Sequence, residues 1–461
     1  MKGESGHVLH IDPLSGAESW IIYQPIKGVE LSMVVVIDKA RLIVQDDMRR
    51  EWLSVLFYVL VSVILSALFC ALQWPGPSAR YVLPISIIMS LITFVGIYGL
   101  WKVAERYPVP VNSDELKIYS SNVLKEFENK QKSAAQESKL APPKFVETGV
   151  YLQSVEFEGA NNVKISAYIW QRYKKGLHAG ITRGFVLPEA HTPTVVEVHR
   201  SLSDPDDPAC ATEVVALRDC DELIRWYVTG SLRQAFDYSH YPLDSQQVWL
   251  RMWHDSYQDN VVLVPDIDAY VMFNPKGLPG VQEGFVLPGW QLQEAWFSIH
   301  EQIFNTNFGD QAGQGIQRKP ELLYNISIER EFLNPFVSRI IPAAVISIMM
   351  FLIVLISTKT GEAAAWLGFT ANDVVVGLSA LFFVIGLTHT DLRQSLSSSS
   401  IMYFEYLYFV IYIMLLYVAI SSVYIAQRDL IAGYDENFLT KSLFWPFLSS
   451  AIFLVTFGVL Y

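Results

Sequence analysis

The chain has 461 residues, of which 51% are hydrophobic and 13% aromatic, and its formal net charge is −12 from 34 basic and 46 acidic residues. The mean hydropathy is positive, which excludes an ordinary soluble protein, but a long polar segment occupies the middle of the chain. This combination predicts a membrane protein with a large aqueous domain. The acidic balance argues against nucleic acid as a partner and is compatible with attracting cations.

Residues 1–50 form a short segment without the apolar core of a signal peptide. Ser19–Tyr23 and Ser32–Asp38 alternate in period two and predict two strands. The stretches HIDPLSGAESWIIYQPI and LSMVVVIDKARLI resemble the closing strands of an extracytoplasmic Cache sensor domain. The resemblance implies a truncated sensor piece with most of its ligand pocket absent, and whether the N-terminus is a gene fragment stays open. The alternative is a plain hairpin that caps a neighbouring part of the chain.

Residues 51–104 are expected to contain two transmembrane helices, over Leu53–Trp74 and Tyr81–Trp101. Each apolar run has about 20 residues, which is what a helix needs to cross roughly 30 Å of hydrocarbon. The short turn Pro75–Arg80 between them predicts an antiparallel pair. The segments on either side of the pair are therefore expected on the same side of the membrane, although the basic flanks do not decide which side.

Residues 105–147 are polar and rich in Lys, Glu, Gln and Ser, and we interpret them as a connector. A helix is predicted there over Ser113–Lys132. From residue 148 to 330 the pattern changes to short alternating runs separated by Pro, Gly and Asp, which predicts an all-β sandwich. The predicted strands are Val150–Glu158, Val163–Trp170, Thr194–His199, Val248–Trp253 and Leu322–Glu329. Trp290 and Trp296 are interpreted as core aromatics of a further strand.

The cysteines are too few for a disulfide framework or a zinc site, since the chain has three. Cys210 and Cys220 lie in the polar domain, where a bridge and two free thiols both remain open, because spacing alone cannot supply the geometry of a disulfide.

Residues 331–461 carry four further apolar runs, and each predicts a membrane helix. They are Phe336–Ser357, Trp366–Leu387, Ile401–Ala426 and Leu443–Tyr461.

The second of these four runs carries a polar stripe. Thr370, Asp373, Gly377, Leu381 and Val384 recur at three- and four-residue steps, which places them on one helix face. A carboxylate within a membrane helix by default faces protein or water and marks an ion or substrate path. The alternative is that Asp373 only forms hydrogen bonds between helices. One striped helix cannot enclose water, so the pattern predicts a ring-shaped homo-oligomer.

Two stretches resemble the pentameric ligand-gated ion channels, the superfamily of Cys-loop receptors and their bacterial relatives. Phe236–Val248 is similar to the Phe-Pro-Phe-Asp-x-Gln loop of that family, with Gln234 and Val248 where animal members have two cysteines. Arg330, followed by Ile340-Ile-Pro342, resembles the arginine before the first channel helix and the proline within it. Four apolar runs then follow in the family's order.

The resemblance implies an extracytoplasmic all-β sandwich followed by a four-helix transmembrane bundle, here preceded by two extra transmembrane helices. It implies a homopentamer in the lipid bilayer of a bacterial cytoplasmic membrane, with the sandwich facing the periplasm or exterior. Such a channel passes cations, responds to an unknown small agonist or ion and needs no cofactor. The residues expected to couple sandwich to pore are Tyr241, Pro242, Asp244, Arg330 and Asp391, the last in a polar joint over Asp391–Ser400.

The resemblance also implies an agonist site under aromatic side chains between subunits, which would suit a cationic ligand. Its candidates are Phe185, Tyr257, Phe304 and Phe308, each with ordinary packing as the alternative. A separate acidic turn, with Asp204, Asp206 and Asp207, has the oxygen ligands that calcium prefers and would make calcium a modulator. A plain solvated turn is the alternative.

In the pore, the resemblance places Glu362 at the cytoplasmic mouth. Five copies each of Glu362 and Asp373 would form two negative rings that favour cations. Leu381 and Val384 are expected to form an apolar constriction. Counting from Glu362 and counting back from Ser397–Ser400 give pore registers several residues apart, so the register stays open.

Two other classes of function were weighed. A non-conducting membrane sensor would couple the Cache-like piece to the sandwich, and Asp373 would then serve only helix packing. An enzyme is not expected, because the sequence has no nucleophile–base pair, metal-ligand cluster or phosphate loop.

Overall fold

The structure is a computed structural model. It describes residues 6–11, 18–25, 32–38, 79–106, 115–137, 141–201, 221–255, 260–304, 317–357, 370–396, 398, 400–428, 430–431, 434–435 and 437–460. The chain divides into two compact units. The first comprises Met1–Leu42, Val109–Phe236 and Ser245–Glu329, and the second comprises Ile43–Pro108, Asp237–Asp244 and Arg330–Tyr461.

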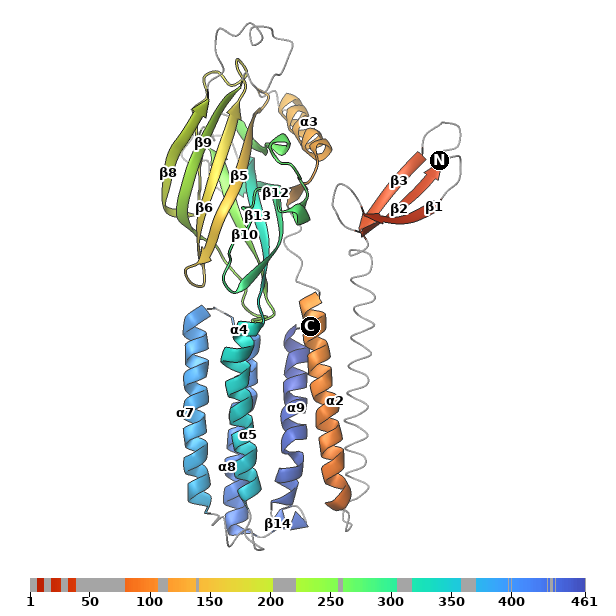
Figure 1. Ribbon diagram of the computed structural model, residues 1–461, viewed down its shortest axis with the longest axis vertical. Helices are drawn as coiled ribbons and strands as arrows, with labels where there is room; N and C mark the ends of the chain where they lie inside the picture. Colours follow the sequence, from red (N-terminus) through yellow and green to blue (C-terminus); the bar gives the residue numbers. More distant parts are fainter. Residues whose placement is uncertain are drawn as a thin grey trace. The chain divides into compact units, whose positions relative to one another are not determined.

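The first unit contains two five-stranded sheets among its described residues. One has the order β4 (Leu116–Ile118), β12 (Trp290–Phe304), β13 (Gln317–Arg330), β10 (Ser245–His254) and β7 (Phe185–Val186). The other has the order β11 (Val261–Pro265), β5 (Lys144–Phe157), β6 (Asn162–Tyr173), β9 (Glu222–Arg233) and β8 (Ala190–Ser201). Figure 1 shows β5, β6, β9 and β8 of this sheet side by side. The β-rich domain predicted from the alternation is confirmed, although β7, β9 and β11 were not predicted.

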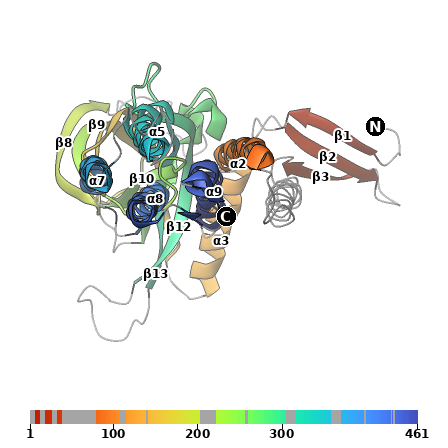
Figure 2. The ribbon, with the colours of Figure 1, turned by 90° about the horizontal axis from the view of Figure 1, so that it is seen from below.

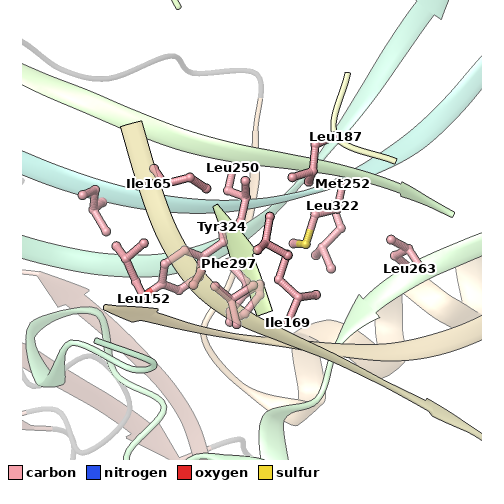
Figure 3. Close-up of a cluster of buried hydrophobic side chains, with 14 of the residues drawn as sticks. Leu152, Ile165, Ile169, Leu187, Leu250, Met252, Leu263, Phe297, Leu322 and Tyr324 are labelled. Carbon is pink, nitrogen blue, oxygen red and sulfur yellow. The ribbon is translucent and has the colours of Figure 1, made fainter. Parts of the chain in front are cut away.

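A single apolar cluster lies between the two sheets (Figure 3). Leu152, Ile165 and Ile169 come from β5 and β6, and they meet side chains of the opposite sheet. Those side chains include Leu250, Met252, Phe297, Leu322 and Tyr324. The burial of every second residue along β6 explains why period-two patterning predicted this strand. Trp290 and Trp296 are both buried in β12, as predicted.

The connector differs from its prediction. Leu116–Ile118 is a strand that pairs with Ile299–Phe297 of β12, and helix α3 covers Ser121–Glu137 rather than Ser113–Lys132. Ile118 is buried and Leu116 is exposed. Pairing with the edge of β12 and burial of Ile118 thus outweighed the helix propensity of this segment. Phe127 of α3 then packs edge-on against Phe145 at 6.5 Å between ring centroids.

The N-terminal residues form a three-stranded antiparallel sheet of β1 (Gly6–Ile11), β2 (Glu18–Pro25) and β3 (Ser32–Asp38). The two predicted strands lie within β2 and β3, and β1 was not predicted. The first predicted membrane segment, Leu53–Trp74, lies outside the described residues.

The second unit has, within its described residues, five helices long and apolar enough to span a membrane, so the chain is a multi-pass membrane protein. They are α2 (Ala79–Arg106), the continuous span Leu333–Ile356, α7 (Ala371–Leu396), α8 (Tyr403–Gln427) and α9 (Phe438–Leu460). Figure 2 shows α2 beside α9, and α5, α7, α8 and α9 grouped together. A short hairpin of β14 (Leu430–Ile431) and β15 (Tyr434–Asp435) lies between α8 and α9.

The span Leu333–Ile356 consists of α4 (Leu333–Pro335), a π-helical turn over Phe336–Ile340 and α5 (Ile341–Ile356). Pro342 has no N–H to donate to the carbonyl of Ser338, four residues earlier, so the regular ladder is interrupted there. The wider turn therefore ends just before this proline.

Helix α7 differs most from its prediction over Trp366–Leu387. It is described from Ala371 and continues to Leu396, so Asp391 lies on the helix and not in a joint. The apolar run ends at Leu387, but Leu392 is fully buried and keeps one face packed. Packing on one face is enough to continue a helix through polar sequence, which a hydropathy reading does not detect.

Candidate functional site

The best-defined polar contact of the second unit joins Asp244 and Arg330 (both in that unit). Ser245 is opposite Glu329 in the β10–β13 pairing, so continuing the antiparallel register places Asp244 opposite Arg330. The guanidinium donates from Nε to Oδ1 at 2.6 Å and from Nη2 to Oδ2 at 2.9 Å. The side chain of Asp244 is 2% exposed and that of Arg330 is 12% exposed. Such a two-bond fork fixes orientation as well as charge.

Two tyrosines flank this ion pair. The Arg330 guanidinium carbon lies 4.8 Å from the ring centroid of Tyr241 and 5.9 Å from that of Tyr238. Burial raises the pKa of Tyr238 to about 12 and also raises the pKa of Tyr241, against the lowering effect of Arg330. Both phenols therefore stay neutral at physiological pH, and their faces attract the cation without neutralising it.

The loop Asp237–Asp244 contacts the start of α8. The rings of Tyr241 and Phe404 meet at 87° with centroids 5.7 Å apart. The Tyr403 amide donates to the Ser239 carbonyl at 2.8 Å. The Tyr241–Pro242 peptide bond in this loop is cis. One ring contact and one backbone hydrogen bond thus connect the loop to the start of α8.

Arg339, in the π-helical turn before α5, joins the same loop to α7. Its Nη1 lies 2.7 Å from Oδ2 of Asp391 and donates to the carbonyl of Thr388 at 3.2 Å. Burial raises the pKa of Tyr241, and Arg339 lies close enough to that phenol to oppose the rise. The Arg339 side chain is 14% exposed, and its charged and hydrogen-bonding partners are Asp391 and Thr388 of α7.

Glu405 joins α7 to α8. Its carboxylate lies 2.9 Å from Nη1 of Arg393 and 3.3 Å from Nε2 of His389, both on α7. It also accepts from the Met402 amide at 2.9 Å, which caps α8. His389 makes a further contact through Nδ1 to the Tyr412 hydroxyl at 3.1 Å. One buried carboxylate therefore ties the end of α7 to the start of α8.

We call this region the loop–helix junction, defined by Asp237–Asp244, Arg330, Arg339, the α7 segment Thr388–Arg393 and the α8 segment Tyr403–Glu405. The structure brings together here all the residues predicted to couple, namely Tyr241, Pro242, Asp244, Arg330 and Asp391. Sequence reasoning missed Arg339, His389 and Glu405, and it included Arg393 only as a member of the polar joint Asp391–Ser400. Charged residues flanking or inside apolar runs were the available signal for Arg339 and Glu405.

Asp373 lies in the first turn of α7, at one end of the candidate span Ala371–Leu396. The hydroxyl of Thr370 accepts from the Asp373 amide at 3.1 Å and donates to its Oδ2 at 2.5 Å. Thr370 and Asp373 thus form a reciprocal cap, a favourable place for a carboxylate because a helix N-terminus is partially positive.

The predicted stripe of α7 is not uniformly exposed. A Cβ on Gly377 would lie 3.5 Å from Cδ1 of Ile353, so this position faces α5, and Leu381 is half-buried. Asp373 and Val384 are exposed. The side directed away from the buried Val374, Leu378, Ile385 and Leu392 instead carries Val376, Phe383 and Leu387, which are 62%, 66% and 56% exposed. Periodicity identified a face but not which apolar residues pack against neighbouring helices.

Among the predicted agonist residues, Phe185 lies on β7, half-buried and edge-on to Trp226 at 5.3 Å between centroids. Phe304 is the last residue of β12. The other predicted residues lie outside the described part of the chain: Tyr257, Phe308, Glu362, Asp204, Asp206, Asp207, Cys210 and Cys220. Within the described residues, no group of three His, Cys, Asp or Glu side chains is placed to hold a metal ion.

The site must be interpreted from its own geometry. No protein-family model and no curated protein sequence matches the chain.

Proposed function

We propose that the chain is the subunit of a homopentameric, cation-preferring ion channel, gated by a small ligand or an ion that acts through the β-sandwich domain. The proposed location is a bacterial cytoplasmic membrane, with the sandwich on the periplasmic or exterior side. Calcium is a proposed modulator, and no cofactor is required.

The observation that carries this proposal is the chain of contacts in the loop–helix junction. The Tyr241 ring lies 4.8 Å from the Arg330 guanidinium and near enough to Arg339 to feel its charge, and Arg339 pairs with Asp391 on α7. A displacement of the loop would therefore act directly on α7 through packed and charged contacts, which is a physical route for coupling.

The exposure of α7 supports its role as the pore-lining helix. Only 17% of its span is buried inside the chain, the smallest share of the five candidate spans in the described residues. Around a five-fold axis, Val376, Phe383 and Leu387 would form apolar rings that gate by excluding water. Asp373 at the first turn would add a ring of carboxylates, which favours cations.

A non-conducting membrane sensor is the second candidate. The observation in its favour is the Thr370–Asp373 cap, which gives the carboxylate a structural role without any pore. In that case the loop–helix junction would transmit a signal between the chain's two units without opening a path for ions.

The deciding experiment is voltage-clamp recording from the purified protein in planar bilayers with asymmetric salt, while pH and calcium are stepped and small organic cations are added. We expect a current whose reversal potential follows the cation gradient. The Arg330→Gln variant should no longer open and should give no current. The surface variant Arg200→Gln is its matched control and should keep the native current. Protein proven pentameric that stays silent under every condition supports the sensor.

A further inference from the structure

The turn between β6 and β7, residues 174–184, closes over a buried histidine. His178 is 1% exposed, and its Nδ1 accepts from the Lys174 amide at 3.0 Å. Its Nε2 is also buried and has no hydrogen-bond partner among the described residues. The Tyr173 ring stands perpendicular to the imidazole at 6.0 Å between centroids. Because Nδ1 accepts a hydrogen bond, it is the nitrogen without a proton.

Three cations surround this ring. Arg183 donates to the carbonyls of His178 at 3.3 Å and Ile181 at 2.7 Å. Lys144, on β5, donates to the Ala179 carbonyl at 3.4 Å, and Lys174 itself is the third cation. The carboxylates of the region are already paired, since Glu147 lies 2.9 Å from Lys174 and Glu222 of β9 lies 2.8 Å from Arg183.

The turn is also connected to β7 and β10. The Gly184 amide donates to the Tyr173 hydroxyl at 3.2 Å, and that hydroxyl lies 3.3 Å from Nε2 of His254 on β10. The Asp255 amide donates to the Gly184 carbonyl at 3.3 Å. Phe185, a predicted agonist residue, follows directly in the chain, so the state of the turn bears on its position.

Burial is the largest cause that lowers the pKa of His178, from 6.5 to about 4, followed by Lys174, Arg183 and Lys144, while Glu147 opposes them. Protonation would place a proton on Nδ1, which breaks the bond from the Lys174 amide, and would add a charge beside three cations. A buried, unpaired imidazolium is strongly disfavoured. The ring can relieve this only by leaving its pocket.

We infer that residues 174–184 are an acid-released clasp, which protonation of His178 opens and which frees the start of β7. The inference concerns the sandwich by itself and does not depend on the channel proposal. The pKa of His178 is about 4 in the closed turn and 6.5 in the open turn, so the closed turn binds fewer protons. The stability of the closed turn relative to the open one is therefore greatest above about pH 6.5 and decreases as the pH falls toward 4. With those limits, the open fraction should be about 30-fold larger at pH 5.0 than at pH 7.5.

Hydrogen–deuterium exchange of the full chain in detergent tests this at pH 7.5, 6.5 and 5.0, with rates corrected for the intrinsic pH effect. Exchange in residues 174–184 should rise about 30-fold at the lowest pH. Leu322–Glu329 of β13, which makes none of the contacts described for the turn, serves as the internal reference and should not change. If both segments respond equally, or if neither does, the inference is wrong.

His178→Asn is the matched variant, because its side-chain oxygen can accept from the Lys174 amide but does not titrate. The pH response of residues 174–184 should disappear in it, while His191→Asn, at an exposed position on β8, should keep the native response. A response that persists in His178→Asn overturns the inference. If His178→Asn does not fold, the same exchange measurement on Lys144→Gln tests the inference. This variant keeps a donor for Ala179 and removes one cation, so the pH response must shrink, and an unchanged response counts against the clasp.

Discussion

At the scale of single residues, the strongest constraint is the Asp244–Arg330 fork. Both side chains are nearly buried, so removing one partner takes the two-bond charged contact away from a group that has little access to solvent. Arg330→Gln should therefore lower the free energy of unfolding by about 3–5 kcal/mol. Chemical unfolding in detergent, followed by tryptophan fluorescence, measures this. The pair Arg200–Glu197, 39% exposed on both sides, is the control, and its Arg200→Gln variant should change little.

Glu321 provides a pH prediction. Its side chain on β13 is fully buried, 3.2 Å from Nη1 of Arg251, whose Nε lies 2.8 Å from Glu189. Burial raises the pKa of Glu321 to about 7, although Arg251 opposes the shift. Between pH 4.5 and 7 the folded chain keeps a proton that the unfolded chain has released, so this carboxyl group lowers stability as pH rises through that window.

Glu321→Gln removes that titration. We expect the variant to unfold several degrees higher than the native chain at pH 8 and at nearly the same temperature at pH 4.5. Thermal unfolding at the two pH values checks this, with the exposed Glu197→Gln as control. Equal melting temperatures of variant and native chain at pH 8 would contradict it.

At the scale of elements, the β5–β6 pair depends on a glycine. Gly149 is opposite Trp170, and a Cβ there would lie 2.1 Å from the indole Cε2. The indole cannot simply swing away, because its Nε1 donates to the buried Asp266 at 3.1 Å. Gly149→Ala should destabilise the sandwich by roughly 3 kcal/mol through overpacking. Gly99→Ala on α2, where nothing lies within 4 Å, should be neutral or slightly stabilising in the same thermal assay.

Helix α7 offers adjacent phenylalanines with different surroundings. Phe382 lies 5.6 Å from the ring of Tyr412 on α8, whereas Phe383 is on the side directed away from the buried face. In the proposed pore, a quaternary-ammonium thiosulfonate should modify Phe383→Cys much faster than Phe382→Cys and change the current. Because the native chain has three cysteines, its own response to the reagent is the baseline. Equal rates at the two positions would place Phe383 outside a water-filled path.

At the scale of the whole molecule, the proposed pore exists only in the assembly, and selectivity is the property to test. Asp373→Asn keeps the hydrogen-bonding partner of Thr370 but removes five negative charges from a pentamer. We expect an unchanged oligomer and a reversal potential displaced toward the anion value. Asp391→Asn, at the loop–helix junction, should instead alter opening and leave the reversal potential unchanged. An unaltered reversal potential in Asp373→Asn would exclude Asp373 from the pore.

The sequence by itself determined which parts of the chain form sheets and which form membrane helices. Period-two alternation in segments such as Val163–Trp170 and apolar runs of about 20 residues are local patterns, and burial in a core or in lipid selects them directly. The same signal was available in β9, where Ile224, Trp226 and Val228 are buried alternately. The position of Asp244 beside Arg330 was expected from a family resemblance rather than from the pattern of residues.

Only the tertiary structure decided where α7 ends, which of its faces is free and what holds each charge. The extension of α7 to Leu396 depends on the burial of Leu392, and the orientation of Gly377 depends on Ile353 of another helix. Arg339 likewise binds Thr388 of α7, 49 residues away, and Glu405 binds Arg393 and His389 of α7, 12 and 16 residues away. Hydropathy and periodicity describe the preference of a single segment for water, lipid or a protein core in general. These features depend instead on specific contacts between segments, which form only when the chain has folded.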